Sequence, residues 1–444
     1  METDLRMQQD RISPSAGLAP LALPVVLVAS LFFLWGIANN LNDVLIAQFR
    51  SGFSLNDLQS GLVQSAFYLG YFLLALPAAL FMRRFGYKWA VVLGLSLFGV
   101  GALLFIPAAQ AGLYSAFLLA LLVIASGLSF LETSANPLML VLGPAEGGAR
   151  RLNFAQAFNP LGSIAGVLIG QRFIFSSHEL SAEQMARLSP AGQAAAHAAQ
   201  VRAVEGPYLA IGLFVLAWAA VVALVRFPKA ASQGLPQGEA SGAGADIRGL
   251  LRRRRYLFGV ATQFFYVGAQ VGVWSFLIRY AGREVGATPR EASNYLIASL
   301  AAFTFGRFAG AFVMGRIRPA RLTAAFGAIN VGLCLIAAGV GGATGLWALV
   351  AASFFMSVMY PTIFALSVEG LGPATKLGAS FLVMAIIGGA VLTAVMGAMS
   401  DATSIAGAMA VPACAFAVVC LFALTRSAPR GLVADSISPP AGAH

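Results

Sequence analysis

Long apolar segments recur along almost the whole chain, and they constrain its fold more than any other feature. A helix of about 20 mostly apolar residues crosses a bilayer core of about 30 Å. By that rule the sequence predicts twelve transmembrane helices. They cover residues 21–47, 58–82, 88–108, 113–142, 152–174, 207–227, 256–281, 292–314, 322–341, 346–368, 377–399 and 404–425. Only 10% of the 444 residues are charged, against roughly 25% in soluble domains. We therefore expect an all-α membrane protein.

The twelve predicted helices fall into two groups of six. Residues 228–255 separate the groups and combine Ser, Gly and Pro with four consecutive arginines, Arg252–Arg255. This composition is typical of a flexible linker with a basic cluster beside the membrane. We therefore predict an N-terminal six-helix half over 1–227, a cytoplasmic linker over 228–255 and a C-terminal six-helix half over 256–444. Two parallel halves that rock about a site at mid-membrane form a known transporter architecture.

The distribution of basic residues predicts the orientation of the chain. If both termini are inside the cell, 20 Lys and Arg residues lie on the cytoplasmic side and 7 lie outside. Cytoplasmic loops of membrane proteins carry such an excess. We expect a multi-pass protein of the bacterial-type inner (plasma) membrane with both termini cytoplasmic. The net charge of +11 then reflects topology, and we expect no nucleic-acid partner.

Motifs for catalysis or metal binding do not stand out in the sequence. The three cysteines lie in apolar stretches without metal-ligand spacing. No His-rich metal cluster, nucleophile elbow or phosphate loop is present. We therefore expect neither a metal nor a cofactor. A membrane enzyme or sensor is the alternative from another class, and turnover of a bound compound would reveal it.

Two acidic residues lie well inside predicted transmembrane helices, where charge is costly and usually functional. Asp43 is the first, and it shares one helix face with Asn39 and Asn42. Such a face should line a polar cavity rather than contact lipid. The alternative is that these side chains form hydrogen bonds that only hold helices together.

Glu132 is the second intramembrane acid, and Pro137 weakens its helix nearby. Burial in a low dielectric favours the neutral form of a carboxyl group, which suits a residue that loads and releases protons. Asp43 and Glu132 are therefore our candidates for proton coupling. An ion pair between Glu132 and Arg307 would instead hold the carboxylate charged, and the sequence leaves that alternative open.

Amide and aromatic side chains form polar stripes on two predicted helices. Together with Asn39 and Asn42 of the first span, the candidate substrate contacts are Gln156, Asn159, Gln263, Tyr266, Gln270 and Trp274. Amides both donate to and accept from sugar hydroxyls, and aromatic faces stack on pyranose rings. The mixture favours a neutral carbohydrate, although each residue alone is as typical of helix packing. Arg307, the one basic residue well inside a predicted span, either gates, binds a sugar oxygen or snorkels to the cytoplasmic interface.

Several polar segments resemble the fucose-galactose-gluconate:proton symporter family of the major facilitator superfamily, and most of all its L-fucose permeases. They are FFLWGIANNLNDVL from Phe32, QSAFYLGYF from Gln64, GLSFLETSANP from Gly127, RLNFAQAFN from Arg151, QFFYVGAQVGVWSFLIRYA from Gln263, GRFAG from Gly306 and YPTIFA from Tyr360. The resemblance extends over essentially the whole chain apart from the termini, an external loop and the central linker.

This resemblance implies the major facilitator fold and a sugar site at mid-membrane. It implies that Asp43 and Glu132 couple proton and sugar movement, and that Gln156 and Asn159 contact the sugar or its proton relay. The sequence departs at Pro160, where the fucose permeases have a small polar residue. We expect proton-coupled import of a sugar, with L-fucose as the leading substrate. The alternatives are symport of another hexose such as galactose or glucose, a uniporter, and an exporter of an apolar compound.

Overall fold

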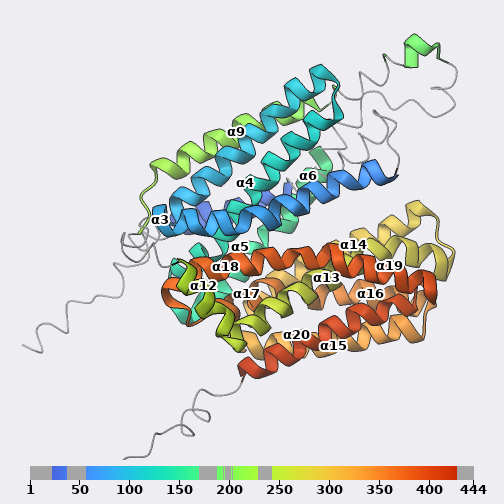
Figure 1. The fold of residues 1–444 in the computed structure, drawn as a ribbon. Coiled ribbons are helices and arrows are strands. Elements are labelled where there is room, and N and C mark those ends of the chain that lie inside the picture. The colour runs from blue at the N-terminus through green and yellow to red at the C-terminus, as the bar shows by residue number, and fades with distance from the viewer. Residues whose placement is uncertain are drawn as a thin grey trace, which may run out of the picture.

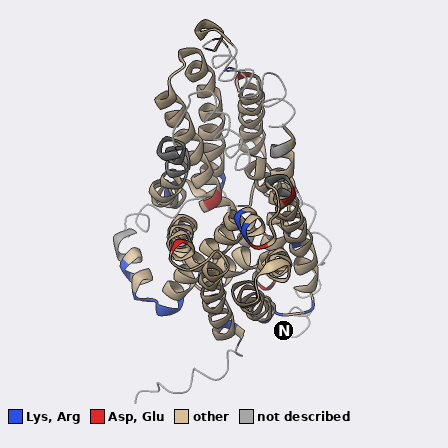
Figure 2. Ribbon diagram, turned by 90° about the vertical axis from the view of Figure 1, so that its right-hand side faces the viewer, with Lys and Arg blue, Asp and Glu red and all other residues tan. Residues whose placement is uncertain are grey.

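The computed structural model describes residues 23–37, 57–169, 188–193, 195, 202, 204–228 and 243–427. The described chain is essentially all helix, and its helices lie in two bundles, one N-terminal and one C-terminal (Figure 1). Among the described residues, eight helices are long and apolar enough to cross a membrane. Most of each bundle consists of uncharged residues (Figure 2). Large apolar side chains such as Phe305 and Leu224 are exposed on its surface, as expected for helices that face lipid.

The helices of the N-terminal bundle correspond to the predicted spans, except that the fifth span is divided into two helices at Ala157. Their bounds are Leu23–Ile37, α3 Asp57–Ala111, α4 Tyr114–Val141, α5 Gly148–Gln156, α6 Phe158–Ile169 and α9 Glu205–Leu224. Helix α3 contains both the second and the third predicted span, which we expected to be separate helices. Gly86 has a φ of 85° inside it, a conformation open mainly to glycine. The two spans therefore meet at a sharp kink instead of a loop.

The C-terminal bundle contains more helix breaks than the sequence analysis predicts. Its helices are α13 Arg254–Val285, α14 Pro289–Val313, α15 Pro319–Gly339, α16 Gly342–Met356, α17 Met359–Val368, α18 Thr375–Met384, α19 Gly388–Ala402 and α20 Ala410–Ser427. The tenth predicted span is divided between α16 and α17, and the eleventh between α18 and α19. A further helix, α12 Ala243–Arg252, lies within the segment that we predicted as a flexible linker.

Glycines allow helices at corresponding places in the two bundles to approach closely. A Cβ atom on Gly162 of α6 would lie 1.9 Å from the carbonyl oxygen of Phe33, in the first helix. A Cβ atom on Gly388 of α19 would lie 2.1 Å from the carbonyl oxygen of Phe264, in α13. Small residues at such crossings are typical of membrane helix pairs. The first and fifth spans thus pack as the seventh and eleventh do.

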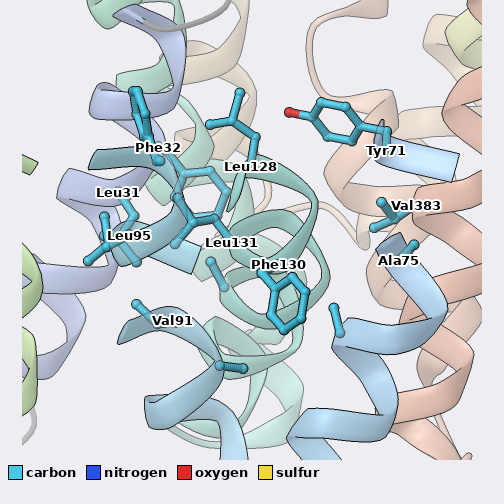
Figure 3. Packing of buried hydrophobic residues seen from close by; sticks show 14 of the residues in the cluster. Leu31, Phe32, Tyr71, Ala75, Val91, Leu95, Leu128, Phe130, Leu131 and Val383 are labelled. Atoms are coloured by element: carbon cyan, nitrogen blue, oxygen red, sulfur yellow. The ribbon is translucent and has the colours of Figure 1, made fainter. Parts of the chain in front are cut away.

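The two bundles pack against each other through α18, which contacts both α3 and α4. Val383 of α18 faces Ala75 of α3 in this interface (Figure 3). At the end of the interface that carries many of the loop arginines, the Lys376 ammonium lies 5.0 Å from the centre of the Tyr87 ring. Lys376 is buried there and is only 7% exposed. The bundles are therefore closed together on this side.

Candidate functional site

Glu132 lies in the contact between the two bundles. It belongs to α4, in a stretch that is buried continuously from Gly127 to Met139, and the residue itself is only 1% exposed. The Tyr360 hydroxyl, from α17 in the other bundle, donates a hydrogen bond to its Oε1 atom. Its Oε2 atom has no hydrogen-bond partner. The carboxyl group thus joins the bundles through one oxygen and leaves the other oxygen available.

Arg307 of α14 is buried beside this carboxyl group and is only 5% exposed. Its Nη1 atom donates to the carbonyl oxygen of Gln156 over 2.6 Å, and its Nε atom donates to that of Ser357 over 3.0 Å. Its guanidinium also lies over the Phe303 ring, 4.7 Å from the centroid. Arg307 and Glu132 interact electrostatically, but the carboxyl oxygens accept no hydrogen bond from the guanidinium. Arg307 points into the protein and does not snorkel toward water.

Amide side chains connect Glu132 to the fifth span. Gln156 donates through Nε2 to Oδ1 of Asn136 over 2.8 Å, and Asn136 donates through Nδ2 to the backbone carbonyl of Glu132 over 3.0 Å. Asn153 crosses between the bundles, because its Nδ2 atom donates to Oγ1 of Thr362 over 3.1 Å. Gln156 therefore lies in the site, with its amide nitrogen bound to the protein.

Asn159 and the polar residues of the first span have different positions. The Nδ2 atom of Asn159 donates to the backbone carbonyl of Phe32 over 3.2 Å, so this amide holds the fifth span against the first. The predicted residues Asn39, Asn42 and Asp43 lie outside the described residues. The structure therefore does not describe the surroundings of Asp43, the other candidate acid.

The predicted stripe on α13 divides into packing residues and residues with unpaired amides. The Tyr266 hydroxyl donates to the carbonyl of Met356 over 2.8 Å, and the indole Nε1 of Trp274 donates to Ser353 Oγ over 3.2 Å. Gln263 is buried beside Tyr360 and interacts with that side chain, yet neither atom of its amide forms a hydrogen bond of ordinary geometry. Gln270 is half-buried. Gln263 and Gln270 thus remain as the members of the stripe whose amides form no hydrogen bond of ordinary geometry with the protein.

Sequence reasoning gave no role to three residues that complete this site. Tyr360 binds the carboxyl group, Thr362 accepts from the opposite bundle, and Asn136 bridges Glu132 and Gln156. All three fall in the polar segments GLSFLETSANP and YPTIFA. A hydroxyl or amide next to a proline in an otherwise apolar span was the signal that could have identified them.

A metal-binding cluster and a large cavity are two other features that could mark a functional site. Among the residues that the structure describes, no group of three or more His, Cys, Asp or Glu side chains could hold a metal ion. A cavity of about 780 Å³ lies among the first helix, α3 and α9. Its lining is apolar apart from groups such as Ser30, and includes Phe33, Phe214 and Trp218. None of its lining residues belongs to the site around Glu132.

Comparisons with known proteins show the family of the chain. The sequence profile of the Major Facilitator Superfamily matches residues 25–385. The L-fucose-proton symporter of Escherichia coli strain K12 is 45% identical over 409 residues, which cover 91% of this chain and 93% of the relative. The glucose/galactose transporter of Brucella abortus is 33% identical over 399 residues, which cover 89% of this chain and 92% of the relative.

A solved structure gives the same result for the fold. The crystal structure of the Major Facilitator Superfamily transporter FucP in the outward conformation matches with a TM-score of 0.86 at 44% identity. The match covers 92% of this chain and 100% of FucP. The chain therefore belongs to the Major Facilitator Superfamily, and within it to the fucose-galactose-gluconate:proton symporter family.

Proposed function

We propose that this chain is a symporter that imports L-fucose together with a proton by alternating access. The observation that carries the proposal is the 45% identity to an L-fucose-proton symporter over 91% of the chain, combined with a buried carboxyl group between the two bundles. Symport of galactose or glucose is the second candidate, because a glucose/galactose transporter is also 33% identical. The relatives are transporters, so the chain is not an enzyme.

Glu132 is the residue that we expect to carry the proton near the interface between the halves. Its bond to Tyr360 crosses that interface, so movement of the halves changes the surroundings of the carboxyl group. Intramembrane acids are costly and are kept where they face a cavity or a proton path. Asp43 is the second proton-coupling residue in this proposal. Protons are the coupling ion, and no cofactor takes part.

The sugar is expected to bind between the halves, in contact with unpaired amides. A buried amide without a partner costs free energy, so Gln263 is best explained by a ligand that supplies the missing hydrogen bonds. Gln270 extends the same face of α13. The remaining proposed contacts belong to the first, fifth and seventh spans. They are Asn39, Asn42, Gln156, Asn159, Tyr266 and Trp274.

The proposal also assigns an orientation to the molecule. The charge excess of the loops supports a cytoplasmic location of both termini, in a cell with a bacterial-type inner membrane. The side on which Lys376 approaches Tyr87 is then the cytoplasmic side, and the halves are closed there. We propose an N-terminal half over 1–227, a cytoplasmic linker over 228–255 and a C-terminal half over 256–444. The partners are sugar, protons and lipid, and none is a nucleic acid.

Uptake of radiolabelled L-fucose tests this function directly. Cells that express the chain are suspended in weak buffer, and external pH is recorded while uptake is measured. We expect uptake with alkalinisation of the medium, and we expect Glu132→Gln and Asp43→Asn to abolish the pH change. Asp401→Asn is the matched control, because Asp401 is an exposed acid at the end of α19.

A different experimental outcome would contradict each part of the proposed function. Uptake of L-fucose without a pH change would make the chain a uniporter. Entry of galactose or glucose, but not of L-fucose, would overturn the substrate and leave symport standing. Equal loss of the pH change in Asp401→Asn would remove the special role of the two intramembrane acids.

A further inference from the structure

Two helix breaks face each other across the interface between the bundles. One separates α5 from α6 at Ala157, and the other separates α16 from α17 at Ser357 and Val358. Each break lies three or four residues before a proline, Pro160 or Pro361. Proline has no N–H group, and its ring pushes away the carbonyl of the residue four positions earlier. The breaks therefore follow from the two prolines.

The carbonyl groups that these prolines release are those of Gln156 and Ser357. Each lies four residues before its proline, so the proline nitrogen cannot donate to it. Both carbonyl oxygens accept hydrogen bonds from Arg307, at 2.6 Å for Gln156 and 3.0 Å for Ser357. One arginine thus binds both acceptors that the two prolines leave unpaired.

Close packing of α14 brings Arg307 to these carbonyls. Added Cβ atoms on Gly306 and Gly310 would lie 2.5 Å from the carbonyl oxygen of Phe354 and 2.2 Å from Cγ1 of Val358. Only residues without a side chain allow α14 to approach the α16–α17 break at this distance. The contact to Ser357 therefore lies within the C-terminal bundle and is fixed by local packing.

The contact to Gln156 differs, because it joins opposite bundles. Helix α14 belongs to the C-terminal bundle and α5 to the N-terminal bundle, and the two are in contact. A buried arginine requires acceptors for its donors, and here those acceptors are backbone carbonyls. Rocking of the halves would break the bond to Gln156 and preserve the bond to Ser357.

We propose that Pro160 is a positioning residue for transport: by releasing the Gln156 carbonyl to Arg307, it creates a latch that holds the two halves closed on the cytoplasmic side. The latch is the Arg307–Gln156 hydrogen bond, with Ser357 as its fixed anchor. This inference rests on the proposed function for the identity of the cytoplasmic side and for the rocking motion. It gives Arg307 a gating role, and it identifies Pro160 as the residue that frees the Gln156 carbonyl to accept a hydrogen bond from Arg307.

Replacement of Pro160 by alanine tests the latch, because it restores an N–H group. That N–H can donate to the Gln156 carbonyl within the helix and so competes with Arg307. A hydrogen bond to a charged donor is strong enough that its loss changes a population ratio by about 10- to 100-fold. We expect the ratio of cytoplasm-open to cytoplasm-closed molecules to rise by that factor.

Distances between spin labels report this ratio without any transport. Labels are attached through Glu146→Cys and Ile317→Cys, which are exposed positions between the long helices of opposite bundles. The full-length protein used for labelling lacks its three native cysteines. Double electron–electron resonance is then recorded in lipid nanodiscs without sugar. Pro107→Ala is the matched control, because Pro107 is an exposed proline inside α3. It should leave the distance distribution unchanged.

The outcomes separate the latch from the proposed function. A shift to longer distances in Pro160→Ala, and also in Pro160→Ser, supports the latch, even if the parent protein imports no L-fucose. A distribution equal to that of the parent in whichever of these variants folds refutes the latch, even if L-fucose import is intact. A shift of the same size in Pro107→Ala refutes it too, because loss of any proline would then open the protein.

Discussion

Gln263 and Gln156 offer a direct test of which amides serve the fold and which serve a ligand. Both are buried, with exposures of 0% and 3%, and both lie near Glu132 and its neighbours. Gln156 donates to Asn136 over 2.8 Å, whereas the amide of Gln263 interacts with Tyr360 without forming a hydrogen bond of ordinary geometry. Replacement of each glutamine by leucine, which is similar in size and apolar, should therefore change stability in opposite directions.

The expected size of the effect follows from the cost of an unpaired buried polar group, about 1–3 kcal/mol. Gln263→Leu removes such groups and should stabilise the protein by up to about that amount. Gln156→Leu leaves the Asn136 oxygen unpaired and should destabilise it by about 1–3 kcal/mol. Unfolding of the purified protein in detergent, measured by denaturant or heat, should therefore rank the Gln263 variant above the parent and the Gln156 variant below it.

The same pair separates binding from packing in an uptake assay. On the proposed function, Gln263→Leu loses hydrogen bonds to the sugar, so the KM for L-fucose should rise about 10-fold or more for each lost bond of about 1.4 kcal/mol. Initial rates of uptake into proteoliposomes provide the measurement. If Gln263→Leu destabilises the protein as much as Gln156→Leu and leaves KM unchanged, Gln263 is a packing residue and our reasoning about its amide is wrong.

Two further predictions concern helix packing and capping. Gly388→Ala places a Cβ atom 2.1 Å from a backbone oxygen of α13 and should destabilise the protein by about 1–3 kcal/mol or more. Gly397→Ala, in the same helix with open space around it, should be neutral or slightly stabilising; equal melting temperatures for the two variants would contradict the packing. The Thr288→Ala variant removes the capping box of α14 and should cost about 1 kcal/mol at neutral pH. The backbone and side chain of Thr288 lower the pKa of Glu291, so this part of the cap is lost as pH falls through that lowered pKa, and the difference from the parent should shrink in thermal melts at acid pH.

The positions of the membrane helices could be predicted because hydrophobic length alone determines them. The breaks within helices were harder to predict, since a broken span is as apolar as a continuous one. Pro160 and Pro361 carried the missing information, because a proline disrupts the bond to the carbonyl four residues earlier. The kink at Gly86 was hidden for a different reason. The basic residues around it are equally typical of a loop.

The polar residues could be located from the sequence, but their partners could not. An amide in a span has the same spacing whether it binds a sugar or another helix. In the structure, Asn159 and Trp274 bind protein groups and Gln263 does not. For Arg307, the sequence left gating, sugar binding and snorkelling open, because its acceptors are backbone carbonyls that no residue type reveals. The ion pair between Arg307 and Glu132 was a natural alternative, yet Tyr360 takes the carboxyl oxygen instead.

The choice of partners across the interface has an energetic consequence for a carrier that must open in every cycle. Three polar contacts join the halves near Glu132, and they involve a tyrosine hydroxyl, an asparagine amide and an arginine bound to a carbonyl. Separation of a buried ion pair leaves isolated charges and costs about 3–5 kcal/mol when one partner is lost. A hydrogen bond that is exchanged for water has a net cost of only about 0.5–1.5 kcal/mol, or about 1.5–3 kcal/mol with a charged group. Water enters as the halves part and replaces the partners of these hydrogen bonds. Contacts of this kind can therefore hold the closed state and still allow the halves to separate. An ion pair between Glu132 and Arg307 would oppose that separation.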